Sequence, residues 1–135
     1  MPLIEWDDSL SVGVKEIDHQ HRQLVEHLNI LNDAMKERKG KEVMDNILEG
    51  LVEYAATHFA TEEKYFDKYN YPKTTTHTKE HTNFVINIME FKKGFDDGKV
   101  TLTVELMYFL KDWLSKHIKG SDKGYTKCFN SNGLY

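Results

Sequence analysis

Four runs of apolar residues, each repeating at steps of three and four, constrain the fold of this chain more than any other sequence feature. Such steps place side chains on one face of an α-helix, so each run predicts an amphipathic helix. The runs are Ile17, His21, Leu24, Leu28, Leu31 and Met35; Met44, Ile47 or Leu48, Leu51, Ala55, His58, Glu62, Tyr65 and Phe66; His77, His81, Phe84, Ile88, Phe91 and Phe95; and Leu102, Leu106, Phe109 or Leu110, Trp113 and His117. No alternating strand pattern competes with them, so we expect an all-α protein.

Short breaks with turn chemistry separate the four runs. They are Lys39-Gly40, Asn70-Tyr71-Pro72 and Asp96-Asp97-Gly98. Because helices joined by short turns lie antiparallel, we expect an up-down-up-down antiparallel four-helix bundle with an N-terminal arm. A chain of 135 residues predicts a single domain, residues 1–135. We divide it into an arm over about residues 1–16, a bundle over about 17–122 and a C-terminal tail over about 123–135.

Six polar residues occupy positions in these apolar runs. They are His21, His58, Glu62, His77, His81 and His117. In an antiparallel helix pair, residues equally far from a short turn lie at the same height. His21 and His58 flank the first turn symmetrically, and Glu62 and His77 flank the second. Across the third turn, His117 lies about as far after the turn as His77 and His81 lie before it. All six are therefore expected in one layer near one end of the bundle.

Such a layer predicts a metal site. A single histidine on an apolar face is usually a core residue with an ordinary hydrogen-bond partner, but several imidazoles and a buried Glu62 would be costly without a cation. Asp122 follows His117 by five residues, about 140° around an ideal helix, so it joins the layer only if the helix ends first; Gly120-Ser121 offers a place for that ending. Seven ligands exceed what one ion takes, which favours two metals that share the carboxylates.

Other features exclude several classes of function. The formal net charge of −4 and pI near 6.0 provide no basic surface for nucleic acid. The sequence lacks a secretory leader pattern and an apolar run of membrane-spanning length, so we expect a cytoplasmic protein without membrane insertion. His77 and His81 have a metalloprotease-like spacing, but Thr78 stands where that motif needs Glu. Cys128 is the only cysteine, so nitrogen and oxygen are the expected metal ligands.

The ordered set of ligand spacings resembles the hemerythrin family, and its single-domain bacterial members in particular. Further similar stretches are "VGVKEIDHQHRQL" at 12–24, "HFATEE" at 58–63 and "WLSKHI" at 113–118, and the resemblance covers roughly Ile4 to Tyr125. It implies a centre of two iron ions, one held by His77, His81 and His117 and the other by His21 and His58. It also implies that Glu62, Asp122 and an oxo or hydroxo group bridge the two irons.

The resemblance implies reversible dioxygen binding at the position left open on the two-histidine iron, in an oxygen carrier, store or supplier. The oxygen pocket would be formed by Leu24, Phe59, Phe84, Trp113, Leu114 and Ile118, with Leu114 as the main shield. Neutral imidazoles outnumber carboxylates, which disfavours highly oxidised iron and an oxidase. The alternatives are a di-iron enzyme, such as a peroxidase or a nitric oxide or peroxide detoxifier, and an oxygen or redox sensor. The sequence identifies no delivery partner, and iron rather than manganese or zinc rests on the resemblance.

Overall fold

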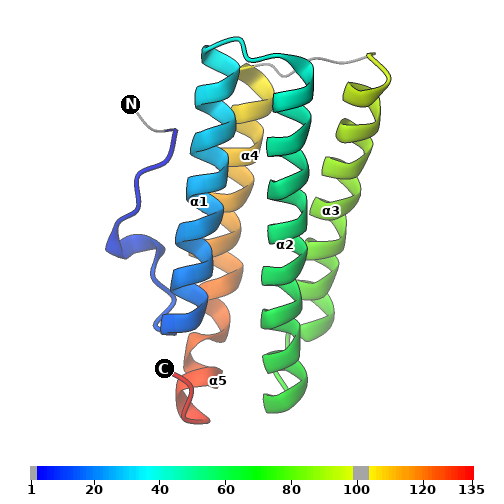
Figure 1. Cartoon of the computed structure of the whole chain (residues 1–135). Helices are drawn as coiled ribbons and strands as arrows, with labels where there is room; N and C mark the ends of the chain where they lie inside the picture. Colours follow the sequence, from blue (N-terminus) through cyan, green and yellow to red (C-terminus); the bar gives the residue numbers. More distant parts are fainter. Residues whose placement is uncertain (1–2, 99–103) are drawn as a thin grey trace.

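Four long α-helices run side by side along the molecule in the computed structural model (Figure 1). They are α1 (Lys15–Lys36), α2 (Lys41–Tyr69), α3 (Thr74–Asp96) and α4 (Val104–Lys116). The structure describes residues 3–98 and 104–135, and these contain no strand. The chain rises through α1, descends through α2, rises again through α3 and descends through α4, which confirms the all-α, up-down-up-down bundle.

The apolar runs of the sequence form the interior of this bundle. Ile17, Leu31, Leu48 and Leu51 are at most 2% exposed, and each lies at a predicted inward position. Leu102, the first residue of the fourth run, lies outside the described residues. The three predicted breaks coincide with the observed ends of α1, α2 and α3 to within a few residues. Among the described residues, no helix combines the length and the apolar character needed to cross a membrane.

The segment before α1 packs along the bundle and contains a short 3-10 helix, η1 (Asp8–Leu10). Ile4 and Asn29 of α1 exchange two hydrogen bonds, in which the Ile4 N–H donates to Asn29 Oδ1 and Asn29 Nδ2 donates to the Ile4 carbonyl, both at 2.9 Å. Val12 and Val14 are buried, and the Arg22 guanidinium lies 5.0 Å from the centre of the Trp6 ring. This segment is therefore attached to the bundle through both polar and apolar contacts.

The last part of the chain continues from α4 as a π-helix, η2 (His117–Asp122), a 3-10 turn, η3 (Lys123–Tyr125), and a short helix, α5 (Thr126–Ser131). Tyr125 and Phe129 are fully buried. Thr126 Oγ1 donates a hydrogen bond of 2.6 Å to the Val12 carbonyl, which links this segment to the residues before α1. Residues that the sequence described only as a tail thus close the end of the bundle where α1 begins and the C-terminus lies (Figure 1).

Helix α1 ends with a non-glycine residue in the left-handed conformation. Arg38 has a φ of +56°, and the N–H groups of Lys39 and Arg38 donate to the carbonyls of Ala34 and Met35, each at 3.1 Å. This is the Schellman arrangement, which favours glycine at the left-handed position because other L-residues lose about 1–2 kcal/mol there. We expect Arg38→Gly to raise the free energy of unfolding by up to about 1 kcal/mol in urea denaturation.

Glu37→Gly is the matched control, because Glu37 has a right-handed φ of −81°. Glycine offers no conformational relief there and adds freedom to the unfolded chain, so this variant should be less stable than the parent. A loss of stability in Arg38→Gly would contradict the assignment of this helix end.

Candidate metal centre

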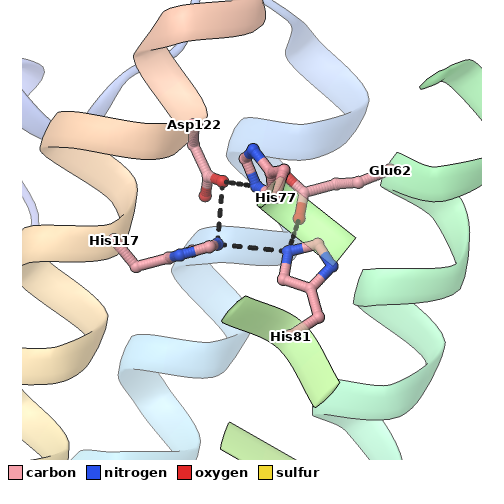
Figure 2. Close-up of side chains that lie close together, drawn as sticks. All are labelled: Glu62, His77, His81, His117 and Asp122. Atoms are coloured by element: carbon pink, nitrogen blue, oxygen red, sulfur yellow. Dashed lines mark hydrogen bonds and ion pairs between the residues drawn. The ribbon is translucent and has the colours of Figure 1, made fainter. Parts of the chain in front are cut away.

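Seven polar side chains meet in one buried layer near the end of the bundle where α2 turns into α3. Each of them is at most 5% exposed. The layer contains His21 of α1, His58 and Glu62 of α2, His77 and His81 of α3, and His117 and Asp122 of η2. Figure 2 shows five of them pointing toward one another from three different elements. The structure therefore brings together all seven residues that the sequence analysis proposed as ligands.

Local backbone geometry explains how α2, α3 and η2 each contribute two groups, while α1 contributes His21 alone. His58 with Glu62, and His77 with His81, are four residues apart and share one face of an α-helix. His117 and Asp122 are five apart, and here α4 has widened into the π-helix η2, in which the Lys123 N–H donates to the Ile118 carbonyl. A π-helix winds more slowly than an α-helix, so residues five apart come onto nearly the same face. The helix does not end at Gly120-Ser121 as the sequence suggested; it changes its winding.

The ligand atoms fall into two groups that share both carboxylates. One group contains Glu62, His77, His81, His117 and Asp122, and the other contains His21, His58, Glu62 and Asp122. Within each group, one nitrogen or oxygen atom per residue lies within 4.8 Å of all the others. Two neighbouring cations with shared carboxylates match this division.

Each carboxylate reaches histidines of both groups. The two oxygens of Asp122 contact different groups. Oδ1 lies 2.8 Å from His77 Nε2 and 3.0 Å from His117 Nε2, both of the first group, and Oδ2 lies 3.0 Å from His21 Nε2 of the second group. Glu62 uses one oxygen, since Oε1 lies 3.2 Å from the Nε2 atoms of both His58 and His81. All five imidazoles thus direct Nε2 into the layer.

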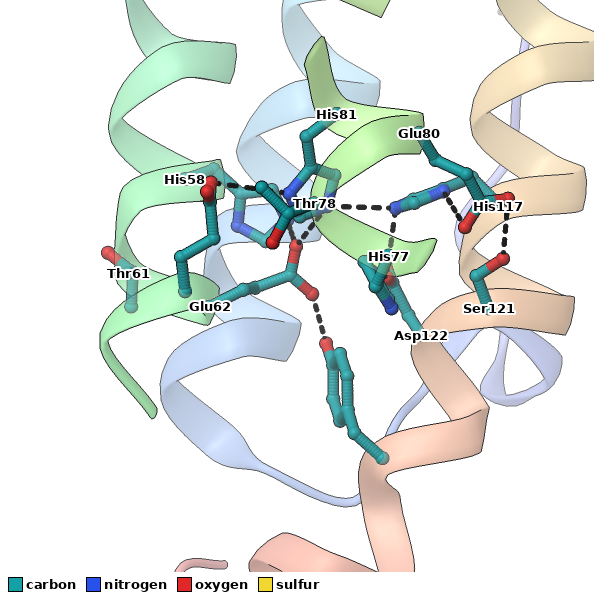
Figure 3. Close-up of polar contacts among 12 residues, drawn as sticks. His58, Thr61, Glu62, His77, Thr78, Glu80, His81, His117, Ser121 and Asp122 are labelled. Atoms are coloured by element: carbon teal, nitrogen blue, oxygen red, sulfur yellow. Dashed lines mark hydrogen bonds and ion pairs between the residues drawn. The ribbon is translucent and has the colours of Figure 1, made fainter. Parts of the chain in front are cut away.

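Three outer ring nitrogens lie near possible acceptors: that of His58 makes a hydrogen bond, whereas those of His81 and His117 do not, and Figure 3 shows Glu80 beside His117. His58 Nδ1 lies 2.7 Å from Gln20 Oε1, and the Nδ1 atoms of His81 and His117 lie 3.5 and 3.8 Å from carboxylate oxygens of Glu63 and Glu80. For His58, the Gln20 oxygen favours the tautomer that carries its hydrogen on Nδ1. The Nε2 lone pair is then free to bind a cation, as in metal sites where an outer partner orients the histidine.

Unpaired atoms within the layer support a cation. Among the described residues, His21 Nε2, His77 Nε2, Glu62 Oε1 and both Asp122 oxygens are buried without a conventional hydrogen bond, which is costly unless an ion satisfies them. His81 Nε2 and His117 Nε2 lie 3.1 Å apart. Two nitrogen ligands about 2.1 Å from one ion and at right angles would lie about 3 Å apart. The donor set and its spacing therefore fit a metal.

Electrostatics keep the two carboxyl groups ionised. Burial acts to raise both pKa values, but the nearby histidines outweigh it: His117 holds the pKa of Asp122 well below its usual range. For Glu62, burial and the Asp122 charge are likewise outweighed, and His58 and His81 bring the pKa to about 2. Burial and both carboxylates raise the pKa of Tyr125 well above its ordinary value, so its phenol stays neutral. Both carboxyl groups of the layer are thus ionised.

A small apolar cavity lies about one helical turn from this layer, toward the middle of the bundle. Its volume of about 10 Å³, counted for the centre of a water-sized sphere, is near the minimum for one water molecule. It is lined by Leu24, Leu28, Leu51, Ala55, Phe59, Phe84, Leu110, Trp113 and Leu114. Five of the six proposed pocket residues are in this lining; Ile118 is fully buried but does not line the cavity.

Two aromatic rings of this lining pack against the ligand imidazoles. Phe59 stacks on His81 with ring centres 4.0 Å apart, and Trp113 stacks on His117 at 4.5 Å. The cavity and the ligand layer therefore share walls that hold the rings in place.

The two histidines outside the proposed layer lie elsewhere. His19 is exposed, and the His27 ring lies 5.2 Å from the Tyr54 ring, centre to centre.

The residues that contact the layer from outside were not predicted from the sequence. Gln20, Glu63 and Glu80 each stand directly beside a ligand in the sequence, but their position alone does not reveal which way they face. Tyr125 follows Asp122 by three residues, and its hydroxyl donates to Glu62 Oε2. It belongs to the stretch that the sequence assigned to the tail.

Comparisons with known proteins agree with this geometry. Residues 12–128 match the family model described as the hemerythrin HHE cation binding domain. A bacteriohemerythrin of Stenotrophomonas maltophilia is 34% identical over 93% of this chain and 80% of its own length. A bacteriohemerythrin of Clostridium acetobutylicum is 34% identical over 91% of this chain and 98% of its own length. A crystal structure of wild-type hemerythrin matches with a TM-score of 0.88 and 28% identity, covering 93% of this chain and 97% of that one.

Gln20 provides a test of the cation site, because its amide oxygen accepts from His58 Nδ1 and orients that ring. Gln20→Leu removes the acceptor, and we expect it to weaken Fe²⁺ binding by about 10- to 100-fold, measured anaerobically by competition with a chelator. Gln20→Glu retains an acceptor and should stay within a few-fold of the parent. Equal affinities in both variants would show that this contact does not orient a ligand.

Proposed function

Because this chain belongs to the hemerythrin family, we propose that it binds dioxygen reversibly at a non-haem di-iron centre and acts as an oxygen carrier, store or supplier. The observation that carries the proposal is the pair of overlapping ligand groups that share Glu62 and Asp122 beside an apolar cavity. The family and the buried cluster support an iron protein. Dioxygen as the ligand is the step that we propose.

The proposed ligand assignment follows the two groups. His77, His81 and His117 would hold one iron, His21 and His58 would hold the other, and Glu62, Asp122 and a solvent-derived oxo or hydroxo group would be shared by both. The iron held by two histidines would have one protein ligand fewer than the other, which would leave a position for dioxygen. When bound, the two irons supply the two electrons that dioxygen binding requires.

The apolar cavity is the proposed dioxygen pocket. Its lining includes Leu24 and Leu28 of α1 and Leu51 and Ala55 of α2, the two helices that carry His21 and His58. Phe84 of α3 and Leu110, Trp113 and Leu114 of α4 complete the lining, so all four helices enclose the cavity. A small apolar molecule can occupy such a space, whereas water would find no polar partner there. Exclusion of water and protons protects the bound state from conversion to free peroxide.

The donor set favours binding over oxidation of a substrate. The layer contains five imidazoles and two carboxylates, and neutral nitrogen ligands stabilise highly oxidised iron less well than carboxylates do. The same centre in a peroxidase, a peroxide or nitric oxide detoxifier, or a redox sensor would be distinguished by its behaviour with dioxygen. Each of those roles requires net oxidation of the centre or a partner that responds to it.

The direct test is the visible spectrum of anaerobically reduced, iron-loaded protein through repeated cycles of oxygen addition and removal. We expect a charge-transfer band that appears with oxygen and vanishes when oxygen is removed, because release of dioxygen would return both electrons to the irons. Irreversible conversion to a diferric spectrum with release of peroxide would contradict the carrier proposal and favour an enzyme or a sensor.

Leu114 tests the role of the cavity. It is 6% exposed and stands one turn before His117. Leu114→Ala enlarges the cavity and admits water, so we expect the oxygenated protein to oxidise irreversibly several-fold faster, followed as decay of the oxygen-dependent band. Leu114→Met keeps the volume and should oxidise at a rate near that of the parent. If Leu114→Ala oxidised at the same rate as the parent, Leu114 would not be the residue that keeps water from the site.

A further inference from the structure

Tyr125 is a fully buried phenol whose hydroxyl hydrogen-bonds to a carboxylate of the ligand layer. It is 0% exposed and donates to Oε2 of Glu62, which is also 0% exposed. A buried hydroxyl that donates to an ionised acceptor forms one of the stronger protein hydrogen bonds. This contact occurs inside the layer proposed to hold the irons, so it can influence how Glu62 meets them.

The two carboxylates of the layer differ in how their oxygens are used. Both oxygens of Asp122 face histidine nitrogens at 2.8–3.0 Å. Only Oε1 of Glu62 faces histidines, His58 and His81, each at 3.2 Å. Glu62 Oε2 accepts the hydrogen bond from Tyr125. The phenol therefore occupies the oxygen of Glu62 that is turned away from those nitrogens.

The surrounding packing fixes the phenol in this position. The Tyr125 ring stacks on Phe129 with ring centres 4.4 Å apart, and Phe66 and His77 lie 5.7 and 5.6 Å from it. Tyr125 ends η3, the 3-10 turn that directly follows η2 and Asp122. The same distortion that brings Asp122 into the layer therefore also places Tyr125 against the opposite carboxylate.

We propose that Tyr125 is a positioning residue of the di-iron centre, which fixes the Glu62 carboxylate in the ligand layer through its hydrogen bond to Oε2. The inference rests on the proposed function, since it assigns Glu62 to the irons. A carboxylate that accepts a hydrogen bond donates less negative charge to a bound metal, so the oxidised centre is stabilised less. Tyr125 thereby favours return to the diferrous state and slows irreversible oxidation.

The test compares Tyr125→Phe with the control Tyr71→Phe. Both changes remove one hydroxyl from the same aromatic group, since the two rings lie 6.2 Å apart. Tyr71 is 7% exposed, and the hydroxyl contact with Glu62 belongs to Tyr125. The first measurement is Co²⁺ binding to the metal-free protein, which involves no dioxygen. The second is the reduction potential of the iron-loaded protein in an anaerobic titration.

We expect Tyr125→Phe to bind two Co²⁺ ions with about tenfold lower affinity, because Glu62 loses its fixed orientation. Its reduction potential should shift to a more negative value, and its oxidation in air should accelerate. Tyr71→Phe should match the parent in Co²⁺ affinity, in reduction potential and in the rate of oxidation in air. Equal affinity and equal potential in Tyr125→Phe and the parent would overturn the inference. Loss of the helical circular dichroism of Tyr125→Phe would also overturn it, because the role would then be structural.

The Co²⁺ measurement tests the role of Tyr125 separately from the proposed oxygen binding. A parent protein that binds two Co²⁺ ions but oxidises irreversibly in oxygen would refute the carrier role. The difference in Co²⁺ affinity between Tyr125→Phe and Tyr71→Phe would still decide whether Tyr125 positions Glu62.

Discussion

The burial of two carboxylates among five imidazoles is the constraint on which the rest of this structure depends. Charged groups removed from water are costly unless opposite charge or a metal satisfies them, and here they sit in one layer that is at most 5% exposed. Four helices are needed to deliver them, and the helices must end at heights that align the layer. The arrangement of the four helices is therefore what holds these side chains together in one buried layer.

Two different environments enclose this layer. On the side toward the bundle centre, Phe59 and Trp113 stack on ligand imidazoles and line an apolar cavity. On the outer side, Gln20 and Glu80 face ring nitrogens, and Tyr125 donates to Glu62. The apolar side suits a small neutral ligand, while the polar contacts orient the groups proposed to hold the irons. This separation is consistent with the proposed binding of dioxygen without its consumption.

Much of this arrangement was predictable from the sequence, because helical periodicity and turn chemistry are local properties. The apolar runs indicated the inward faces, and equal distances of His21 and His58 from the first turn indicated one layer. The π-helix was not predictable, because its winding depends on packing at the end of the bundle, although the position of Asp122 signalled some distortion. Tyr125 was missed because its contact with Glu62 spans 63 residues and no periodic pattern links them.

The most direct test of the shared-carboxylate centre is a crystal structure of the iron-loaded protein with anomalous scattering measured at the iron edge. The account predicts two iron peaks in the buried layer, one beside His77, His81 and His117 and the other beside His21 and His58, with Glu62 and Asp122 contacting both. A single peak, or two peaks that do not share these carboxylates, would contradict it.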